Sequence, residues 1–411
     1  MSNFAINVLL ARWLTPEAYG AFTVAFIIFL LGGAVHGGLF TEPMLVFGAG
    51  RFQHRVPSYL RVLLAGHVRF VIVIGLILCI SAAAFYAGGE VELAAALGAL
   101  AVAQAFITFL WLMRRACYII FRPQLATLAG AGYLVLVVGS AVVFQEMGLL
   151  TGPMAFGVMG GGALVSGGGL AWYLGVFRAS DQSGLVEEVR AAHWEYGRWA
   201  SATGGLQWLR SALPFLVLPL FVGLEGTATL RALFNLAMPA LQGFSALVLL
   251  ALPVFVQARL KGRLFQTARN LGVALVGLAI GYGLLIGLFG TSLLAWLYRD
   301  QYEAAPALIW LMAVLPLFAV IAGVLMAVLR AQERPKAAFQ ARVCAVGTAA
   351  TVGVAFTALF GVFGAICSDL LAKATEVLVM VSMLRRDREL NVVEAVDNPD
   401  VALDASIASG G

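Results

Sequence analysis

Charged residues are scarce in this chain, and their scarcity limits the classes of protein it can belong to. Asp, Glu, Lys and Arg make up 11% of its 411 residues, whereas soluble domains carry about 25%. Hydrophobic residues make up 62%, and apolar runs long enough to cross a hydrocarbon core of about 30 Å as helices recur along the chain. This composition excludes a soluble globular domain and indicates an integral membrane protein.

Cysteine and histidine are also too few and too scattered to form the sites they usually form. The cysteines lack the CxxC spacing of a zinc site and the pattern of a disulfide framework. The histidines lack HExxH or triad spacing, and the sequence has no nucleophile elbow. We therefore expect no enzyme activity, no cofactor and no metal. The residues are Cys79, Cys117, Cys344, Cys367, His36, His54, His67 and His193.

The sequence does contain a regular series of apolar segments, which predicts an all-α membrane protein with about twelve transmembrane helices. The first segment, of 14 residues, would rise only about 21 Å as a helix, too little to cross the membrane untilted. We expect a first helix that is truncated or that starts upstream. The expected spans are 1–14, 19–40, 65–86, 91–112, 125–145, 150–177, 199–222, 228–256, 268–290, 304–329, 338–360 and 362–384.

Basic residues are unevenly divided between the two sides of these spans. If alternate loops face the cytoplasm, twenty of the 26 Lys and Arg lie on that side and only Arg12, Arg231 and Arg299 lie on the other. Such a bias is the positive-inside signal. We therefore expect a multi-pass protein of the bacterial inner membrane with both termini in the cytoplasm. The net charge of +5 reflects these loops and does not indicate nucleic-acid binding.

Two stretches of the sequence repeat at nearly the same offset. A shift of 208 residues lays residues 10–26 on residues 218–234, and a shift of 212 lays Arg122-Pro123 on Arg334-Pro335. Such internal similarity indicates two parallel six-helix halves, which suits a transporter whose site lies between two lobes. The expected division is an N-terminal lobe at 1–177, a cytoplasmic linker at 178–198, a C-terminal lobe at 199–385 and a disordered cytoplasmic tail at 386–411.

Two segments resemble a known family. Residues 7–26, NVLLARWLTPEAYGAFTVAF, resemble the first-helix, turn and second-helix pattern of polysaccharide-biosynthesis flippases of the multidrug, oligosaccharidyl-lipid and polysaccharide exporter (MOP) superfamily. Residues 288–313, LFGTSLLAWLYRDQYEAAPALIWLMA, resemble that family's pattern before and through its tenth helix. The resemblance, which covers nearly the whole chain, implies two lobes around a central cavity. It also implies translocation of an undecaprenyl-diphosphate-linked oligosaccharide for exopolysaccharide, capsule or O-antigen synthesis.

Polar residues inside the spans predict where such a substrate would bind. Ionisable residues in a bilayer need a partner or a watery cavity, and arginine makes paired hydrogen bonds to phosphate oxygens. Many family members carry an Asp-Arg pair in the seventh helix, where this chain has Pro214 and Phe215, so no role is carried over from that pair. The expected cavity residues are Arg210, Gln207, Thr203, Asn235, Arg231, Gln242, Arg69 and Asn7.

A structural role is the alternative for several of these groups. Arg210 could pair within its own lobe, and Arg69 could extend to the lipid headgroups. In the twelfth span, Asp369, Lys373 and Glu376 share one helical face and could neutralise one another through i,i+4 and i,i+3 contacts. The other interpretation of this group is ion coupling, by binding a proton or a sodium ion.

Three other functions compete with the flippase. A multidrug cation antiporter of the same fold would need an acidic residue in the cavity of the first half, and the first six spans carry Asp or Glu only at their ends. A membrane polymerase or ligase would need a long external loop, and the outer loops are short. A non-transporting scaffold of a glycan-assembly complex stays open. Expected partners are the lipid-linked oligosaccharide, membrane lipids and a polysaccharide polymerase or other assembly proteins.

Overall fold

The computed structural model describes residues 2–48, 51–178, 184–302, 304–332 and 334–397, and every element in these ranges is a helix. The expected all-α membrane fold is confirmed. The first unit of the chain contains α1 (Ser2–Trp13), α2 (Pro16–His36), η1 (Gly37–Thr41), α3 (Glu42–Phe47), η2 (Gln53–Arg55), α4 (Val56–Ala87), α5 (Val91–Ile119), α6 (Pro123–Glu146), α7 (Gly152–Tyr173), η3 (Val176–Arg178) and α8 (Leu185–Val217). There follow α9 (Pro219–Leu260), α10 (Leu264–Tyr298), α11 (Pro306–Ala331), α12 (Pro335–Thr348), η4 (Ala349–Gly353) and α13 (Val354–Asp397).

The helices begin where the sequence supplies starting residues. The hydroxyl of Thr15 accepts a hydrogen bond from the amide of Ala18 at 3.3 Å and caps α2, and Thr151 caps α7 in the same way. Proline occupies one of the first two positions of both helices. A helix start tolerates proline because the first amides have no partner inside the helix. The polar turn before α2 is therefore a helix boundary between two apolar segments.

Nine helical segments in the described residues are long and apolar enough to cross a membrane. Three expected spans are not among these nine as separate segments. The span 1–14 corresponds to α1, which is apolar but short, and the span 199–222 corresponds to α8, which carries more polar residues. The spans 338–360 and 362–384 form one continuous segment in the structure. α9 breaks at Gly223 (φ 77°, ψ −178°) and α13 breaks at Gly361 (φ 57°, ψ −130°). Glycine adopts such positive φ values without strain. These breaks fall where the sequence predicts turns, after residue 222 and after residue 360.

The internal repeat is visible in matching helix boundaries. Under the 208-residue shift, Thr15, the cap of α2, falls on Gly223, the break in α9. Under the 212-residue shift, α6 starts at Pro123 and α12 at Pro335, and the residues before them have similar backbone angles (φ −121°, ψ 62° and φ −110°, ψ 65°). The structure therefore contains two repeated bundles.

The chain forms two compact units, Met1–Arg231 and Ala232–Gly411. α8 packs against α2 and η1 and so lies within the first unit. The expected functional division into lobes at residues 178–198 stays a prediction. α13 continues as a helix to Asp397, beyond residue 386, where the tail is expected to begin. Residues 398–411 lie outside the described residues, and the expected tail stays a prediction as well.

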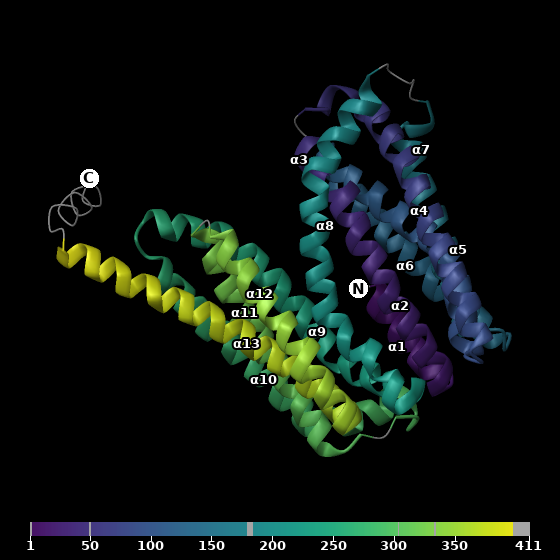
Figure 1. Cartoon of the computed structure of the whole chain (residues 1–411). Coiled ribbons are helices and arrows are strands. Elements are labelled where there is room, and N and C mark those ends of the chain that lie inside the picture. Colours follow the sequence, from purple (N-terminus) through teal and green to yellow (C-terminus); the bar gives the residue numbers. More distant parts are fainter. Residues whose placement is uncertain (1, 49–50, 179–183, 303, 333, 398–411) are drawn as a thin grey trace. The chain divides into compact units, whose positions relative to one another are not determined.

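In the first unit, α5 packs against α2, α4, α6 and α7, and Figure 1 shows it beside α4 and α6. Its approach to α7 depends on the glycine-rich segment of residues 157–169. A Cβ atom at Gly160 would lie 3.1 Å from the Cα of Ala103 on α5, so a larger residue would push the helices apart. Small residues permit such close packing of membrane helices. Gly160, Gly162 and Gly167 therefore serve helix packing, whereas a Cβ atom at Gly161, Gly168 or Gly169 would meet nothing within 4 Å.

In the second unit, α11 packs against both α10 and α13, and α12 packs against α13. Phe255, Leu275, Val320 and Met380 are among the buried apolar residues that form its core. Proline lies inside several helices of the described residues, including Pro214 in α8, Pro239 in α9 and Pro316 in α11. Each proline removes one backbone hydrogen bond from its helix and favours a bend there.

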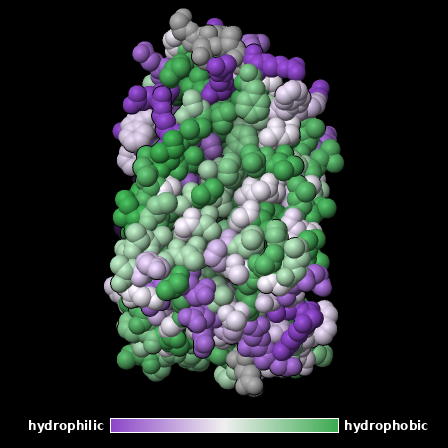
Figure 2. Space-filling model, turned by 90° about the vertical axis from the view of Figure 1, so that its right-hand side faces the viewer, coloured by the Kyte–Doolittle hydropathy of each residue, from purple (hydrophilic) through white to green (hydrophobic). Residues whose placement is uncertain are grey.

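The outward-facing side chains are apolar over long helix faces. On α4, Ile72, Leu76 and Ile80 lie on one face and are 56%, 59% and 70% exposed. Figure 2 shows one face of the molecule with hydrophobic residues over its middle and most hydrophilic ones near its two ends. Such a distribution suits a surface surrounded by lipid, with polar groups at the headgroups. The protein is therefore a multi-pass membrane protein.

Candidate functional site: a polar cavity in the first unit

A cavity of about 670 Å³ opens among five helical elements of the first unit. Its volume falls in the range of small-molecule sites, about 300 to 1,000 Å³. Both polar and apolar groups line it. The lining residues are Leu30, Gly33 and Ala34 of α2, Gly37 and Thr41 of η1, Glu42 of α3, Trp111, Arg114, Arg115 and Tyr118 of α5, and Gly204, Gln207, Trp208 and Ser211 of α8.

Three charged side chains line this cavity. Arg114 and Arg115 come from the end of α5, and Glu42 comes from the start of α3. Arg115 stacks over the ring of Tyr118, with its guanidinium carbon 5.9 Å from the ring centroid. The Nε atom of Arg114 is buried, and no hydrogen bond reaches it in the described part of the chain. With Glu42 ionised, the lining carries a net positive charge, which favours an anionic ligand group.

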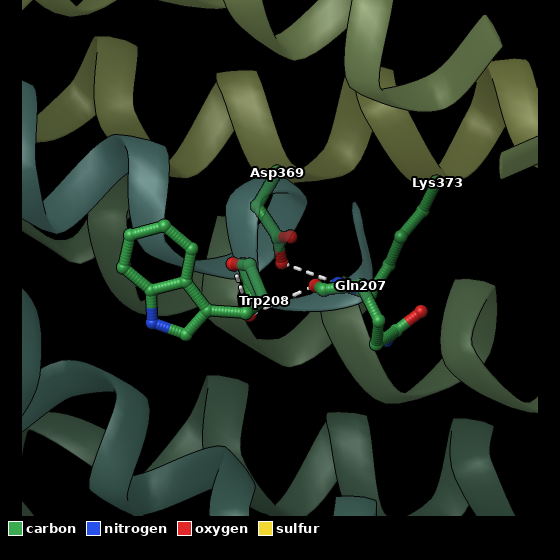
Figure 3. Close-up of polar contacts among 5 residues, drawn as sticks. Gln207, Trp208, Asp369 and Lys373 are labelled. Atoms are coloured by element: carbon green, nitrogen blue, oxygen red, sulfur yellow. Dashed lines mark hydrogen bonds and ion pairs between the residues drawn. The ribbon is translucent and has the colours of Figure 1, made fainter. Parts of the chain in front are cut away.

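Two tryptophans give the cavity rigid walls. The indole Nε1–H of Trp208 donates a hydrogen bond to the carbonyl of Ile27 at 2.7 Å, which ties α8 to α2. Trp111 packs against the ring of Phe29, with centroids 5.3 Å apart. On α8 the hydroxyl of Ser211 donates to the carbonyls of Gln207 and Trp208, as drawn in Figure 3. These contacts hold the wall side chains in place before a ligand enters.

The end of α8 next to the expected linker is anchored by a buried histidine. His193 Nδ1–H donates to the carbonyl of Leu39 at 2.9 Å, and its Nε2 lies 2.7 Å from the hydroxyl of Tyr59, which donates to it. Burial lowers the pKa of His193, and the carbonyl of Leu39 partly opposes this shift. The neutral ring therefore joins α8 to η1 and α4, and the later turns of α8 carry cavity residues.

The predicted site residues of the seventh and third spans lie in different surroundings. Gln207 lines the cavity. Thr203, one turn earlier on α8, is exposed and donates to the carbonyl of Trp199 at 3.0 Å. Arg210 is buried, with 8% of its surface exposed. Arg69 is exposed on α4. The structure thus places one of these four in the described cavity.

Arg231 and Asn7 lie together in a second polar cluster of the first unit. Arg231 Nε donates to Asn7 Oδ1 at 3.2 Å, and the hydroxyl of Tyr19 donates to the same oxygen at 3.4 Å. The guanidinium of Arg231 also lies 5.8 Å from the ring centroids of Phe26 and Phe215. These contacts connect α1, α2, α8 and α9 and satisfy part of the charge of a buried arginine.

The remaining predicted residues lie in the second unit. Asn235 is buried and donates to the hydroxyl of Tyr298 at 3.2 Å, whereas Gln242 is exposed. Lys373 Nζ lies 2.5 Å from Asp369 Oδ2, one turn along α13 (Figure 3). Glu376 is also buried on this helix. The expected i,i+4 contact is present.

Most residues that line the cavity are missed by the sequence-based list of site residues. Arg114 and Arg115 lie just after the predicted span 91–112, and Glu42 lies just after the predicted span 19–40, so their positions in the sequence do not predict a lining role. A signal does exist in the spacing of Trp111, Arg114, Arg115 and Tyr118, which fall on one side of a helix at i, i+3, i+4 and i+7. Aromatic and basic residues on one such face indicate a lining rather than a simple loop.

Several solved structures share this fold at low sequence identity. An inward-facing multidrug-resistance MATE-family transporter of the MOP superfamily has a TM-score of 0.73 and 16% identity, covering 94% of this chain and 95% of that chain. The lipid II flippase MurJ in an inward closed conformation has a TM-score of 0.72 and 11% identity, covering 93% of this chain and 85% of that one. A eukaryotic MATE transporter has a TM-score of 0.64 and 14% identity, covering 93% and 90%.

No protein-family model and no curated protein matches the sequence. The three structures are transporters and a flippase rather than enzymes. The similarity extends over nearly all of this chain and includes the two repeated bundles. The chain therefore has the fold of MOP-superfamily transporters.

Proposed function

We propose that the protein flips a lipid-linked oligosaccharide with an anionic diphosphate head across the membrane, from the cytoplasmic to the outer leaflet. The observation that carries this proposal is the cavity of the first unit, whose lining combines Arg114 and Arg115 with two tryptophans. One of the structures similar in fold is a lipid II flippase. The substrate class follows the resemblance to polysaccharide-biosynthesis flippases, with undecaprenyl diphosphate as the lipid carrier.

The chemistry of the lining fits a diphosphate joined to sugars. Guanidinium groups form paired, charge-assisted hydrogen bonds to phosphate oxygens and stay charged at any working pH. Trp111 and Trp208 offer large apolar surfaces to the rest of the substrate. The carboxylate of Glu42 keeps the net charge of the lining low, so that the head group is held without being trapped, as transport requires.

In this proposal the cavity lies toward the cytoplasmic side, because the predicted orientation places the end of α5 there. The cytoplasmic termini, the bacterial inner membrane and a polysaccharide polymerase as partner remain part of the proposal. The other predicted residues have proposed roles along the path of the head group or in ion coupling. They are Arg210, Arg231, Arg69, Thr203, Asn7, Asn235 and Gln242 for the path, and Asp369, Lys373 and Glu376 for coupling.

A multidrug cation antiporter is the second candidate, and one observation favours it. Such an antiporter needs an acidic residue in the cavity of the first half, and Glu42 lines the cavity from the end of the second span. One of the structures similar in fold is a multidrug-resistance MATE-family transporter, and another is a eukaryotic MATE transporter. The two candidates differ in which side chain is essential: an arginine for the flippase and Glu42 for the antiporter.

The deciding experiment compares both substrates on one reconstituted protein. The full chain in proteoliposomes is given a fluorescent polyprenyl-diphosphate oligosaccharide, and flipping is followed by exposure to a membrane-impermeant quencher. Replacing Arg114 and Arg115 together by Ala should slow flipping at least about tenfold, because each lost charge-assisted bond is worth about 1.5 to 3 kcal/mol. Export of a lipophilic cation is measured in parallel.

The matched control is Arg263→Ala, which removes an exposed loop arginine and should leave flipping unchanged. Glu42→Gln should keep flipping but would abolish cation export in an antiporter. Unchanged flipping in the Arg114→Ala/Arg115→Ala protein, with normal thermal stability, would contradict the proposed function. Cation export that depends on Glu42 would assign the protein to the second candidate.

A further inference from the structure

Two buried histidines face each other beside the cavity wall. His36 Nε2 lies 3.1 Å from His67 Nδ1, and the two rings are nearly perpendicular. His36 has no exposed surface, and His67 is 3% exposed. The sequence does not predict this pair, because the two histidines are far apart in the sequence and neither has motif spacing. The fold brings the end of α2 against α4.

Counting the hydrogen atoms of this pair leaves one nitrogen without a partner. A neutral imidazole has one N–H donor and one acceptor nitrogen. His67 donates its N–H to the carbonyl of Ala105, so its Nδ1 accepts from the Nε2–H of His36. The remaining nitrogen of His36, Nδ1, is then unprotonated and carries a lone pair. It is buried, and no hydrogen bond reaches it within the described residues.

The immediate surroundings of the pair are aromatic. The rings of Phe40 and Phe70 lie 4.9 and 5.5 Å from that of His36, and the ring of Phe109 lies 6.1 Å from that of His67. Charged or titratable residues on the elements that pack around the pair include Glu42 on α3, Arg61 and Arg69 on α4, Arg114 and Arg115 on α5, and His193, Glu195 and Arg198 on α8. Glu42 and Arg114 are also cavity residues.

The pair is joined directly to the cavity wall. His36 is the last residue of α2, and the next five residues form the π-helical segment η1. Two of them, Gly37 and Thr41, line the cavity. Short π-helical segments store an irregular hydrogen-bond pattern and often mark functional positions. A change in the charge of His36 would therefore act on backbone that borders the ligand.

We propose that His36 and His67 form a binding site for a single proton, and that occupation of this site shifts η1 and the cavity wall. A hydronium ion in the water transfers the proton to Nδ1 of His36, so one O–H bond breaks, one N–H bond forms, and a water molecule is left. The Nε2–H···Nδ1 hydrogen bond to His67 then spreads the charge over both rings. A second proton is opposed by repulsion between two adjacent cations, so the pair takes one.

Proton binding itself needs no transport activity, whereas its role in driving transport rests on the proposed function. As a coupling site, the pair would load its proton when the cavity is open to one side and release it when the cavity is open to the other. Substrate movement would then follow a pH gradient through the shape of η1.

The first measurement is ¹⁵N NMR of histidine-labelled full chain in lipid nanodiscs, from about pH 8 to about pH 5. Wild type should show scalar coupling across the His36–His67 hydrogen bond and one titrating nitrogen on His36. His36→Gln and His67→Gln should each take up about one proton fewer per chain over this range. The control is His54→Gln, at an exposed histidine, which should keep the uptake of the pair.

Wild-type spectra alone decide the matter if the variants do not fold. The proposal would be overturned if both imidazole rings stayed neutral, with unchanged ¹⁵N chemical shifts, over the whole pH range. It would also be overturned if a folded His36→Gln protein took up as many protons per chain as wild type. In the second measurement, a pH gradient should stimulate flipping in wild type. In His36→Gln the stimulation should be at least about fivefold smaller. Proton uptake without any flipping would reject the proposed function and leave the proton site supported. Flipping without proton uptake by the pair would reject the proton site and leave the proposed function supported.

Discussion

The two units share a repeated fold but differ in the surroundings of some of their charged side chains. In the first unit, Arg114 lines a cavity and the His36–His67 pair lies beside that cavity's wall. In the second unit, Lys373 and Asp369 form an ion pair one turn apart on a single helix. Buried charges that neutralise one another contribute to structure, whereas charges that line a cavity are available to a ligand. The comparison supports the proposal that a ligand binds in the first unit.

The cavities of the two units support the same distinction. The second unit has a cavity of about 620 Å³ between α10, α11 and α13, similar in volume to that of the first unit. Its lining is mostly apolar, including Phe265, Val324 and Val328, with Arg269 as its charged residue among those described. Volume therefore does not separate the two cavities. The charged and aromatic side chains of the lining distinguish the two cavities, and they favour an anionic head group in the cavity of the first unit.

The largest effect is expected from breaking the ion pair of the second unit. Lys373→Ala leaves the carboxylate of Asp369 buried without its nearest cation, which costs about 3 to 5 kcal/mol. The thermal unfolding midpoint in detergent should fall sharply. Lys336→Ala, at an exposed position, is the control. Recovery of much of the loss in the double variant Asp369→Asn/Lys373→Met would support the structural interpretation, and an unchanged midpoint in Lys373→Ala would refute it.

A smaller, pH-dependent effect is expected from His193 in the first unit. Its pKa is lowered in the folded chain, so the unfolded chain binds more protons as the pH falls. The stability from this residue is complete above about pH 6.5 and is lost as the pH falls through the lowered pKa, by at most about 1.4 kcal/mol per pH unit.

Thermal unfolding across a pH series measures this contribution. His193→Gln should show a flatter pH profile than wild type, and His54→Gln, at an exposed histidine, should keep the wild-type slope. An equal slope in wild type and His193→Gln would mean that the buried bonds to Tyr59 and Leu39 do not control this pH range.

The smallest effect is expected from Trp208. Trp208→Phe keeps an aromatic wall for the cavity but removes the Nε1–H bond to the carbonyl of Ile27, at a cost of about 1 kcal/mol. Trp199→Phe, at a residue that is 69% exposed, serves as the control. Flipping should change less than stability, because the ring surface remains. Loss of flipping at unchanged stability would show that the indole N–H itself contacts the substrate.

Much of the fold was predictable from local sequence because its determinants are local. A membrane helix needs only a run of apolar residues, and the turns at Gly223 and Gly361 fall at the predicted ends of spans. The bilayer imposes one requirement, that every backbone group bond within its own helix. The Lys373–Asp369 contact is equally local, since both residues lie on one helix face.

The cavity and the histidine pair were not predictable in this way. The lining residues come from five elements, and the polarity of Arg114 or Glu42 in the sequence does not reveal which helix it will face. His36 and His67 become a pair only because α2 and α4 lie side by side in the folded unit. Gln207 was predicted because it is a polar residue inside an apolar span, a signal that needs no knowledge of the neighbouring helices.

The sequence by itself determined that this chain is a helical, multi-pass membrane protein with an internal repeat, because hydropathy and turn residues act within single segments. Only the tertiary structure decided which polar groups share a cavity and which cancel one another, because helix rotation and packing set the distances between residues far apart in the chain. Electrostatic and hydrogen-bond energies depend on those distances, so the chemistry of the site follows from the packing.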